Sequence, residues 1–491
     1  MHDPSDAVTA CRAGLPRRLN GCGIRPQTRT AAAAYVGGLL QCLPNLINRK
    51  LADGSTIPGL DHQCAKQLIE AGSLDAGGPP GRWASFLASP SPIAAELRSA
   101  WETLQAIPVA VPVDPDRPDS PLLLRPAAEA GATAGGGLHP QPQHALTSEC
   151  ENAIAYRLDQ HIRALDRTDR RRVAWMNVDH FSRQFIASCP SGGAGFIDNA
   201  ELAECYAEYL GLPSPSCYRH RERPVIPGDS RKIGPYGEGL VSASLGGGWR
   251  VRHDDVKWTL ADLLSWADIP HEVEPRGLFS HLIAAGPAAQ GSPTERARQG
   301  IIPDLIIDPP GDQRFLADIK ALDCSSASRN RYLAADPARR CRAVGNRQTQ
   351  VHSDYHSSAR RLDGTPGACG PVEQALRGYG RVRGLICGSF GEASDDLHAL
   401  ATLIAETAAH RHWRGMGCTD QAGALSHCYT YVRRTLGIAI CRSHARLKLS
   451  RLGNAFGDAA GAASRRAAWP NHWRHLRATV FRARGPSSYA A

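Results

Sequence analysis

Three charged residues within residues 300–323 (GIIPDLIIDPPGDQRFLADIKALD) have the types and spacing needed for metal-dependent hydrolysis. Asp304 follows a proline in a first apolar run, residues 301–307, and Asp318 and Lys320 lie in a second run, residues 315–321. The sequence Asp-Pro-Pro-Gly-Asp-Gln between the runs is a strong turn signal, so the stretch predicts a β-hairpin. Because residues i and i+2 share one face of a strand, Asp318 and Lys320 should point the same way, with Asp304 projecting into the same space.

Two carboxylates and an ammonium group that converge on one sheet suit a divalent cation and a water molecule that attacks a phosphate. Hard cations such as Mg²⁺ prefer carboxylate oxygens, and the metal can activate water and steady the charge that builds on phosphorus. We expect Asp318 and Lys320 at a strand end that faces solvent. Their substitution should therefore remove chemistry without unfolding the chain.

The pair Pro303-Asp304, followed fourteen residues after that aspartate by Asp318-Ile319-Lys320, resembles the PD-(D/E)xK signature of restriction-endonuclease-like nucleases. The resemblance implies that Asp304 and Asp318 hold Mg²⁺ or Mn²⁺, helped by the carbonyl of Ile319. It also implies that Lys320 orients the attacking water and stabilises charge on phosphorus. The reaction that it implies is hydrolysis of a DNA phosphodiester.

Residues 234–279 extend this resemblance upstream. They are similar to the segment that leads into the endonuclease domain behind the reverse transcriptase of some eukaryotic non-LTR retroelements. The glycines at 246–248 and the triplet Arg252-His253-Asp254 fit that pattern. Gly237-Glu238-Gly239 and Ser244 depart from it, because they lack the His and the Cys that the pattern has. The resemblance therefore implies a mobile-element origin, with the ligands of the family's zinc knuckle missing.

The elements that must position these residues follow the order of such a nuclease core. We expect a helix capped by Asp254 or Asp255, because a buried stripe recurs at helical spacing after them; its members are Val256, Leu260, Leu263, Leu264 and Ala267. A strand at 271–275, the hairpin, a basic helix at 343–362, a strand at 384–390 and a helix at 395–409 should follow. The predicted fold class is α/β, a small mixed sheet of the restriction-endonuclease-like type flanked by helices.

The basic helix supplies one further candidate. In many nucleases of this superfamily the helix after the Asp/Glu-x-Lys strand contributes a Gln, sometimes with a Tyr four residues on. Gln350 is the candidate here, with Tyr355 five residues later. The alternative is that Gln350 lies on an exposed helix face.

Composition shifts divide the chain into five predicted segments. Residues 1–106 form a helical, irregular and partly disordered N-terminal region, with 1–30 disordered and a helix that Ser91-Pro92 begins. Residues 107–145 are a Pro/Gly-rich linker, and 146–234 a helical segment. Residues 235–440 form the nuclease core, which includes a helix at 422–436. A basic helix and an Arg-aromatic tail occupy 441–491, and its deletion from Arg465 onward should weaken DNA binding.

Net charge and the motifs that are missing bound the function. The 491 residues carry a formal net charge of +10, which favours a polyanionic partner, DNA above all. The sequence has no Tyr-x-Asp-Asp, no phosphate-loop motif and no G-x-S-x-G, which argues against a polymerase palm, P-loop ATP chemistry and a serine hydrolase. Fifteen cysteines without a C-x-x-C pair suit reduced thiols, and no membrane partner is expected. We expect an intracellular, nuclear protein.

Two other classes of function stay open. One is a catalytically inactive nucleic-acid-binding remnant of a retroelement polyprotein, which would keep the fold and the basic surface. The other is a host interaction protein in which the acidic hairpin is structural.

Overall fold

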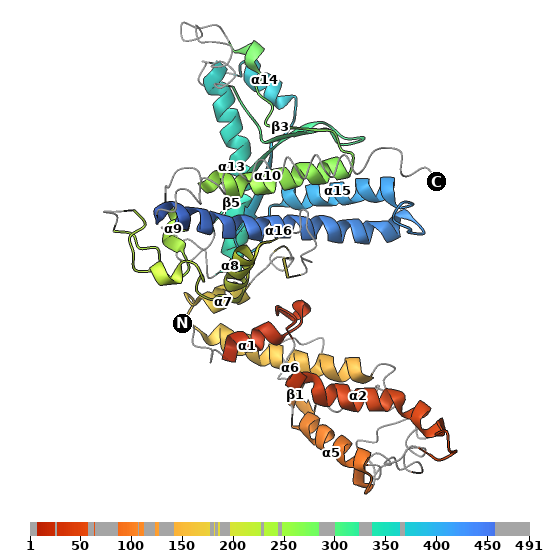
Figure 1. Cartoon of the computed structure of the whole chain (residues 1–491). Helices are drawn as coiled ribbons and strands as arrows, with labels where there is room; N and C mark the ends of the chain where they lie inside the picture. Colours follow the sequence, from red (N-terminus) through yellow and green to blue (C-terminus); the bar gives the residue numbers. More distant parts are fainter. Residues whose placement is uncertain are drawn as a thin grey trace. The chain divides into compact units, whose positions relative to one another are not determined.

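The computed structural model describes residues 7–24, 27–56, 63, 87–106, 108–111, 123–126, 142–176, 181, 185–186, 197–226, 230–243, 248–283, 300–323, 336–363 and 369–456. The chain divides into two compact units, Met1–Leu165 and Asp166–Ala491 (Figure 1). In the part of the chain that the structure describes, no helix is both long and apolar enough to span a bilayer.

The first unit consists mainly of helices. Helix α2 (Gln27–Asn48) packs against α5 (Pro92–Gln105) and α6 (Pro142–Ala164). Helix α5 begins where the sequence predicts, because Ser91 accepts a hydrogen bond from the amide of Ala94 and Pro92 occupies the first turn. Part of the region expected to be disordered is ordered: α1 (Ala7–Gly14) contains a buried arginine, Arg12, whose Nε donates to the carbonyl of Asn20.

The boundary between the units falls later than the predicted linker. Strands β1 (Pro108–Val111) and β2 (Leu123–Pro126) pair in antiparallel fashion within residues 107–145, and α6 begins inside the same stretch. Helix α6 belongs to the first unit because it packs against α2. Most of the Pro/Gly-rich stretch lies outside the described residues, so its role as a linker stays a prediction.

The second unit is built on a four-stranded mixed sheet. Its strands are β3 (His271–Val273), β4 (Leu305–Ile307), β5 (Phe315–Leu322) and β6 (Arg383–Gly388), which lie in that order. Strand β4 is antiparallel to both of its neighbours, β3 and β5, and β6 runs parallel to β5. The predicted hairpin is confirmed, with Leu305 opposite Ala317. The mixed α/β class with a small sheet flanked by helices is likewise confirmed.

Helices cover both faces of this sheet (Figure 1). Alternate strand residues enter two separate cores, as the period of two along a strand requires. Leu305, Phe315 and Ile319 pack with helices α10 (Gly248–Trp266), α15 (Asp395–His412) and α16 (Gln421–Ala455). Ile306 and Leu316 pack instead with α13 (Pro337–Asp363) and α14 (Pro371–Arg377). The even-numbered residues of β5 thus face α13, and the odd-numbered ones face α10.

Helix α10 begins earlier than predicted. Its first residue is Gly248, so Asp254 and Asp255 lie inside the helix and are not its N-cap. Both carboxylates have partners there: Asp254 pairs with Lys257, and Asp255 pairs with Arg442 and Arg446 on α16. The apolar stripe that follows is buried as expected.

Helix α16 joins two elements that the sequence separates. We predicted a helix at 422–436 and a distinct basic helix after residue 441, but one helix of 35 residues runs from Gln421 to Ala455. Its basic residues pair with buried acids, since Arg446 contacts Glu201 and Lys448 contacts Glu208 on α8 (Asn199–Leu210). The predicted boundary at 440/441 therefore falls inside a packed helix, and the Arg-aromatic tail after residue 456 lies outside the described residues.

Candidate functional site

The β4–β5 pairing places two carboxylates side by side. Asp304 immediately precedes β4, and extending the register by one residue from the pair Leu305–Ala317 sets it opposite Asp318. Directly opposed residues have Cβ atoms about 4.5–5.5 Å apart. The amide of Ile319 donates a hydrogen bond to Asp304 Oδ2 at 2.7 Å, which ties the two strands at this point. The role expected for the carbonyl of Ile319, as a further metal ligand, stays a prediction.

Asp318 lies in the middle of β5 and its side chain is only 8% exposed, so the expectation of a solvent-facing strand end is wrong for this residue. Lys320, whose side chain is 36% exposed, places Nζ 2.6 Å from Asp318 Oδ2, and the hydroxyl of Tyr355 donates to Oδ1 at 3.0 Å. Burial and then the charge of Asp304 raise the pKa of Asp318, against the opposing effect of Lys320. A cation between the two carboxylates would relieve this repulsion.

Asp304 is held from the opposite side by α10. His253 Nε2 lies 2.9 Å from Asp304 Oδ2, and its Nδ1 lies 3.0 Å from Asp254 Oδ1. Burial lowers the pKa of His253, but the hydrogen bonds to the two aspartates outweigh it and raise this pKa to about 9. Burial raises the pKa of Asp304, yet His253 and the Ile319 amide hold it below its ordinary value. At neutral pH His253 is therefore a cation that donates to both carboxylates.

Helix α13 contributes Tyr355 and not Gln350. Gln350 is exposed, whereas Tyr355 shares the inward stripe of the helix with Val351 and Ala359, which are buried against the sheet. Spacings of four residues keep these three on one face, and Gln350 falls outside it. The structure thus brings Asp304, Asp318 and Lys320 together and leaves Gln350 apart.

Sequence reasoning assigned no role at the site to two residues that contact it, His253 and Tyr355. His253 was visible only as a member of the Arg-His-Asp triplet, and Tyr355 only as a neighbour of Gln350. The signal for Tyr355 was present in the burial stripe of α13. The contact of His253 with Asp304 spans 51 positions and arises from the packing of α10 across the sheet, which no local pattern reveals.

The donor set fits one hard cation. Among the described residues there is no group of three or more His, Cys, Asp or Glu side chains arranged to hold a metal ion. Mg²⁺, however, is commonly held by one or two carboxylates, with waters and substrate phosphate completing its shell. Asp304 and Asp318 supply two carboxylates, and His253 and the Ile319 amide both contact Asp304 through the same oxygen, Oδ2.

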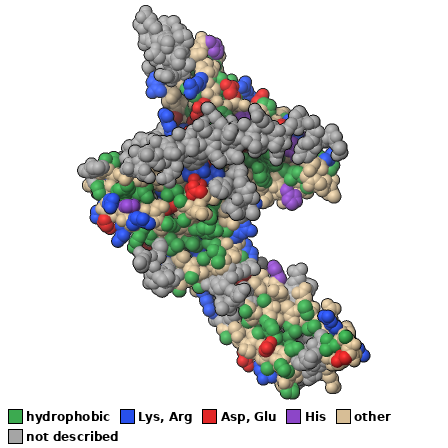
Figure 2. Space-filling model, in the orientation of Figure 1, with side chains coloured by type: hydrophobic (Ala, Val, Ile, Leu, Met, Phe, Trp, Pro, Cys, Tyr) green, Lys and Arg blue, Asp and Glu red, His purple; other side chains and the backbone are tan. Residues whose placement is uncertain are grey.

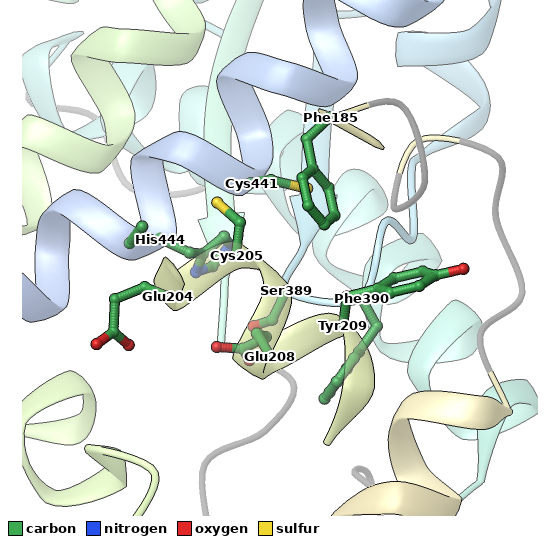
Figure 3. A pocket seen from close by; sticks show the side chains of 10 residues that line it. Phe185, Glu204, Cys205, Glu208, Tyr209, Ser389, Phe390, Cys441 and His444 are labelled. Atoms are coloured by element: carbon green, nitrogen blue, oxygen red, sulfur yellow. The ribbon is translucent and has the colours of Figure 1, made fainter. Parts of the chain in front are cut away.

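A small pocket elsewhere in the second unit does not supply an alternative active site. It lies between α8, the end of β6 and α16, and Figure 3 shows its lining residues, which include Cys205, Glu208, Cys441 and His444. Burial raises the pKa of Cys441 to about 12, and burial with the nearby charge of Arg252 lowers that of His444 to about 3. A protonated thiol and a neutral imidazole of such low basicity give neither a nucleophile nor a base at neutral pH.

Comparison with known proteins adds no assignment. No family model matches this chain, and no curated protein matches it either.

Proposed function

We propose that the second unit is a metal-dependent DNA endonuclease of the restriction-endonuclease-like type and of mobile-element origin. The observation that carries this proposal is the pair of opposed carboxylates, Asp304 and Asp318, with the ammonium group of Lys320 beside them. The element order also supports it. Helix α10, three antiparallel strands, the connecting helix α13 and the parallel strand β6 follow one another as the resemblance implies.

Each residue has a defined task in this mechanism. Asp304 and Asp318 would hold Mg²⁺ or Mn²⁺, which when bound lowers the pKa of water and neutralises charge on the phosphate. Lys320, on the same face of β5 as Asp318, orients the attacking water and stabilises the negative charge that develops on phosphorus. Tyr355 fixes the rotamer of Asp318 through its hydroxyl, and His253 fixes that of Asp304.

Exposed basic residues offer a path for the DNA backbone. Arg219, Arg223, Arg231 and Lys232 are exposed within residues 218–232, where Pro224 pairs with Lys232 in a short antiparallel bridge. Figure 2 shows Lys and Arg side chains gathered on the side of the second unit where α9 (Glu238–Ser242) lies in Figure 1. Such side chains bind phosphates without reading the base sequence.

One observation favours the inactive, DNA-binding alternative. Both carboxylates already have cationic partners in the chain, since protonated His253 contacts Asp304 and Lys320 contacts Asp318. An intramolecular cation at each aspartate would compete with a metal ion. A protein of this kind would bind DNA and not cleave it.

Plasmid nicking separates these functions. Wild-type protein, Lys320→Ala and Asp318→Asn are compared in Mg²⁺, in Mn²⁺ and in EDTA, together with DNA binding at low salt. The proposal expects metal-dependent nicking by the wild type and loss in both variants, with DNA binding retained. Lys50→Ala and Asp354→Asn are matched controls, because Lys50 is exposed in the first unit and Asp354 is an exposed member of a surface ion pair. Wild-type binding without nicking in any metal would identify the remnant, and absence of binding as well would leave the hairpin a structural role.

A further inference from the structure

A buried lysine lies behind the candidate site. Lys257 on α10 has a side chain that is only 2% exposed, and its Nζ lies 2.8 Å from Asp254 Oδ1. The same ammonium group contacts Glu274 Oε1. Removing an ammonium group from water is costly unless carboxylates surround it. Burying Met or Leu at this position would therefore cost less free energy than burying a charged lysine.

The partners of Lys257 lead directly to Asp304. Asp254 Oδ1, which contacts Lys257, is also the oxygen that lies 3.0 Å from His253 Nδ1. His253 Nε2 in turn contacts Asp304 Oδ2 at 2.9 Å. Lys257, Asp254, His253 and Asp304 thus form one continuous chain of charged hydrogen bonds.

Glu274 closes this chain into a loop. Its backbone amide donates to the carbonyl of Asp304 at 3.0 Å, while its side chain contacts Lys257. Glu274 follows β3 with φ of 47°, a left-handed conformation that a non-glycine residue adopts only at a cost in free energy. Glu274 thus contacts Asp304 through its backbone and Lys257 through its side chain.

We propose that Lys257 is a positioning residue of the metal site, which holds Asp304 in place through Asp254 and His253. This inference rests on the proposed function, because the geometry that it maintains is that of a metal ligand. A histidine beside a metal ligand orients it only if the other ring nitrogen is itself held. Such supporting contacts commonly contribute a factor of about 10–100 in metal affinity or activity.

The exposure of its two partners separates a positioning role for Lys257 from a purely structural one. Asp254 and Glu274 are each 44% exposed, so loss of the ammonium group would leave both carboxylates hydrated. Lys257→Met keeps most of the side-chain volume and removes a buried charge. The variant should therefore fold with a melting temperature near that of the wild type, and its defect should appear in the metal site.

The test measures metal binding independently of cleavage. Binding of Mn²⁺ to the full chain is followed by loss of the free-ion electron paramagnetic resonance signal, for wild type, Lys257→Met, Lys257→Arg and the control Lys50→Met. We expect the Mn²⁺ dissociation constant of Lys257→Met to rise by about 10–100-fold, with Lys257→Arg within a few-fold of wild type because its guanidinium reaches both carboxylates. Lys50→Met, at an exposed position of the first unit, should bind Mn²⁺ as wild type does.

Two further variants keep the inference testable if Lys257→Met fails to fold. Asp254→Asn breaks the chain between Lys257 and His253 and should weaken Mn²⁺ binding as strongly as Lys257→Met does. Glu274→Gln keeps the contacts from Lys257 through Asp254 to His253, so it should weaken Mn²⁺ binding less. Equal Mn²⁺ affinity in wild type and Lys257→Met, or in wild type and Asp254→Asn, would overturn the positioning role alone. A wild type that neither binds Mn²⁺ nor nicks DNA would overturn the proposed function together with this inference.

Discussion

Replacing Asp318 with Asn should stabilise the metal-free protein and abolish its response to metal. Asp318 and Asp304 are opposed on paired strands, and the burial of Asp318 together with the charge of Asp304 raises the pKa of Asp318. A carboxyl whose pKa is raised by folding is one whose charged form the folded state disfavours. Asparagine removes that charge and keeps an oxygen to accept the hydrogen bond of Tyr355.

The size of the effect follows from the geometry. Two charges about 5 Å apart in an effective dielectric constant of about 20 repel by about 3 kcal/mol. The attraction between Asp318 and Lys320, whose side chain is 36% exposed, offsets up to about 1 kcal/mol of this repulsion. The net gain for Asp318→Asn is therefore about 2 kcal/mol, or roughly 4 °C in melting temperature for a unit of this size.

The stability difference between Asp318→Asn and the wild type should depend on pH. Because the folded-state pKa of Asp318 is raised, its contribution to wild-type stability is fully present below the ordinary Asp pKa and is lost as pH rises through the raised value. The difference between variant and wild type should thus be small near pH 4 and largest at neutral pH. Saturating Mn²⁺ should reverse the order, since a ligand at 100 times its dissociation constant stabilises the wild type by about 2.7 kcal/mol.

Thermal unfolding in EDTA and in Mn²⁺, at several pH values, measures all of these quantities. Asp354→Asn on α13 is the control, because Asp354 is 52% exposed and pairs only at the surface with Arg347. A loss of about 3–5 kcal/mol in metal-free Asp318→Asn would refute the reasoning. That magnitude is typical of a broken buried ion pair, and it would make Asp318 a structural partner of Lys320.

Three further outcomes are expected. Arg340→Met should lower the free energy of unfolding in urea by about 3–5 kcal/mol, because the fully buried carboxylate of its partner, Glu392, is left unpaired. Arg347→Met, which breaks a surface pair, should cost less than about 1 kcal/mol. Equal losses in the two variants would contradict this. Neutralising Arg219 and Arg223 together should reduce the slope of log DNA affinity against log salt by about 2, and an unchanged slope would remove them from the interface. The depressed pKa of His444, about 3, means that stability is lost as pH falls below the ordinary His value, by about 2 kcal/mol between pH 7 and pH 5; His444→Gln should flatten that slope in urea titrations.

The sequence predicts the hairpin and its charged residues because the signals are local. Two apolar runs, a turn-forming hexapeptide and the alternation of side chains along a strand are enough to set Asp304 near Asp318. The burial of Asp318 is not local, since it depends on Tyr355 and α13 closing over one face of β5. His253 reaches Asp304 only because α10 packs on the other face.

The continuity of α16 shows a second limit of prediction from the sequence. Gly437 and the apolar residues after it read as a break followed by a separate element. In the structure these apolar residues are buried, and the basic residues that follow pair with Asp255, Glu201 and Glu208. The acids lie on α8 and α10, which are distant in the sequence. The segment therefore looks basic in the sequence, although its charges are neutralised by these acids in the fold. The strand pair β1–β2 within a Pro/Gly-rich stretch escaped prediction for a similar reason, since its pairing joins residues that are individually typical of a linker.

The β4–β5 register determines which sequence changes the candidate site can tolerate. Residues 308–314 form a loop between the strands, and Gly311 within it adopts φ of 77° with open space around it. Added residues in this loop would leave Asp304 opposite Asp318, whereas a single residue inserted between Phe315 and Asp318 would turn that carboxylate toward α10. The separation of fourteen residues is therefore a property of loop length and not of the chemistry. Relatives with longer loops would keep the same site.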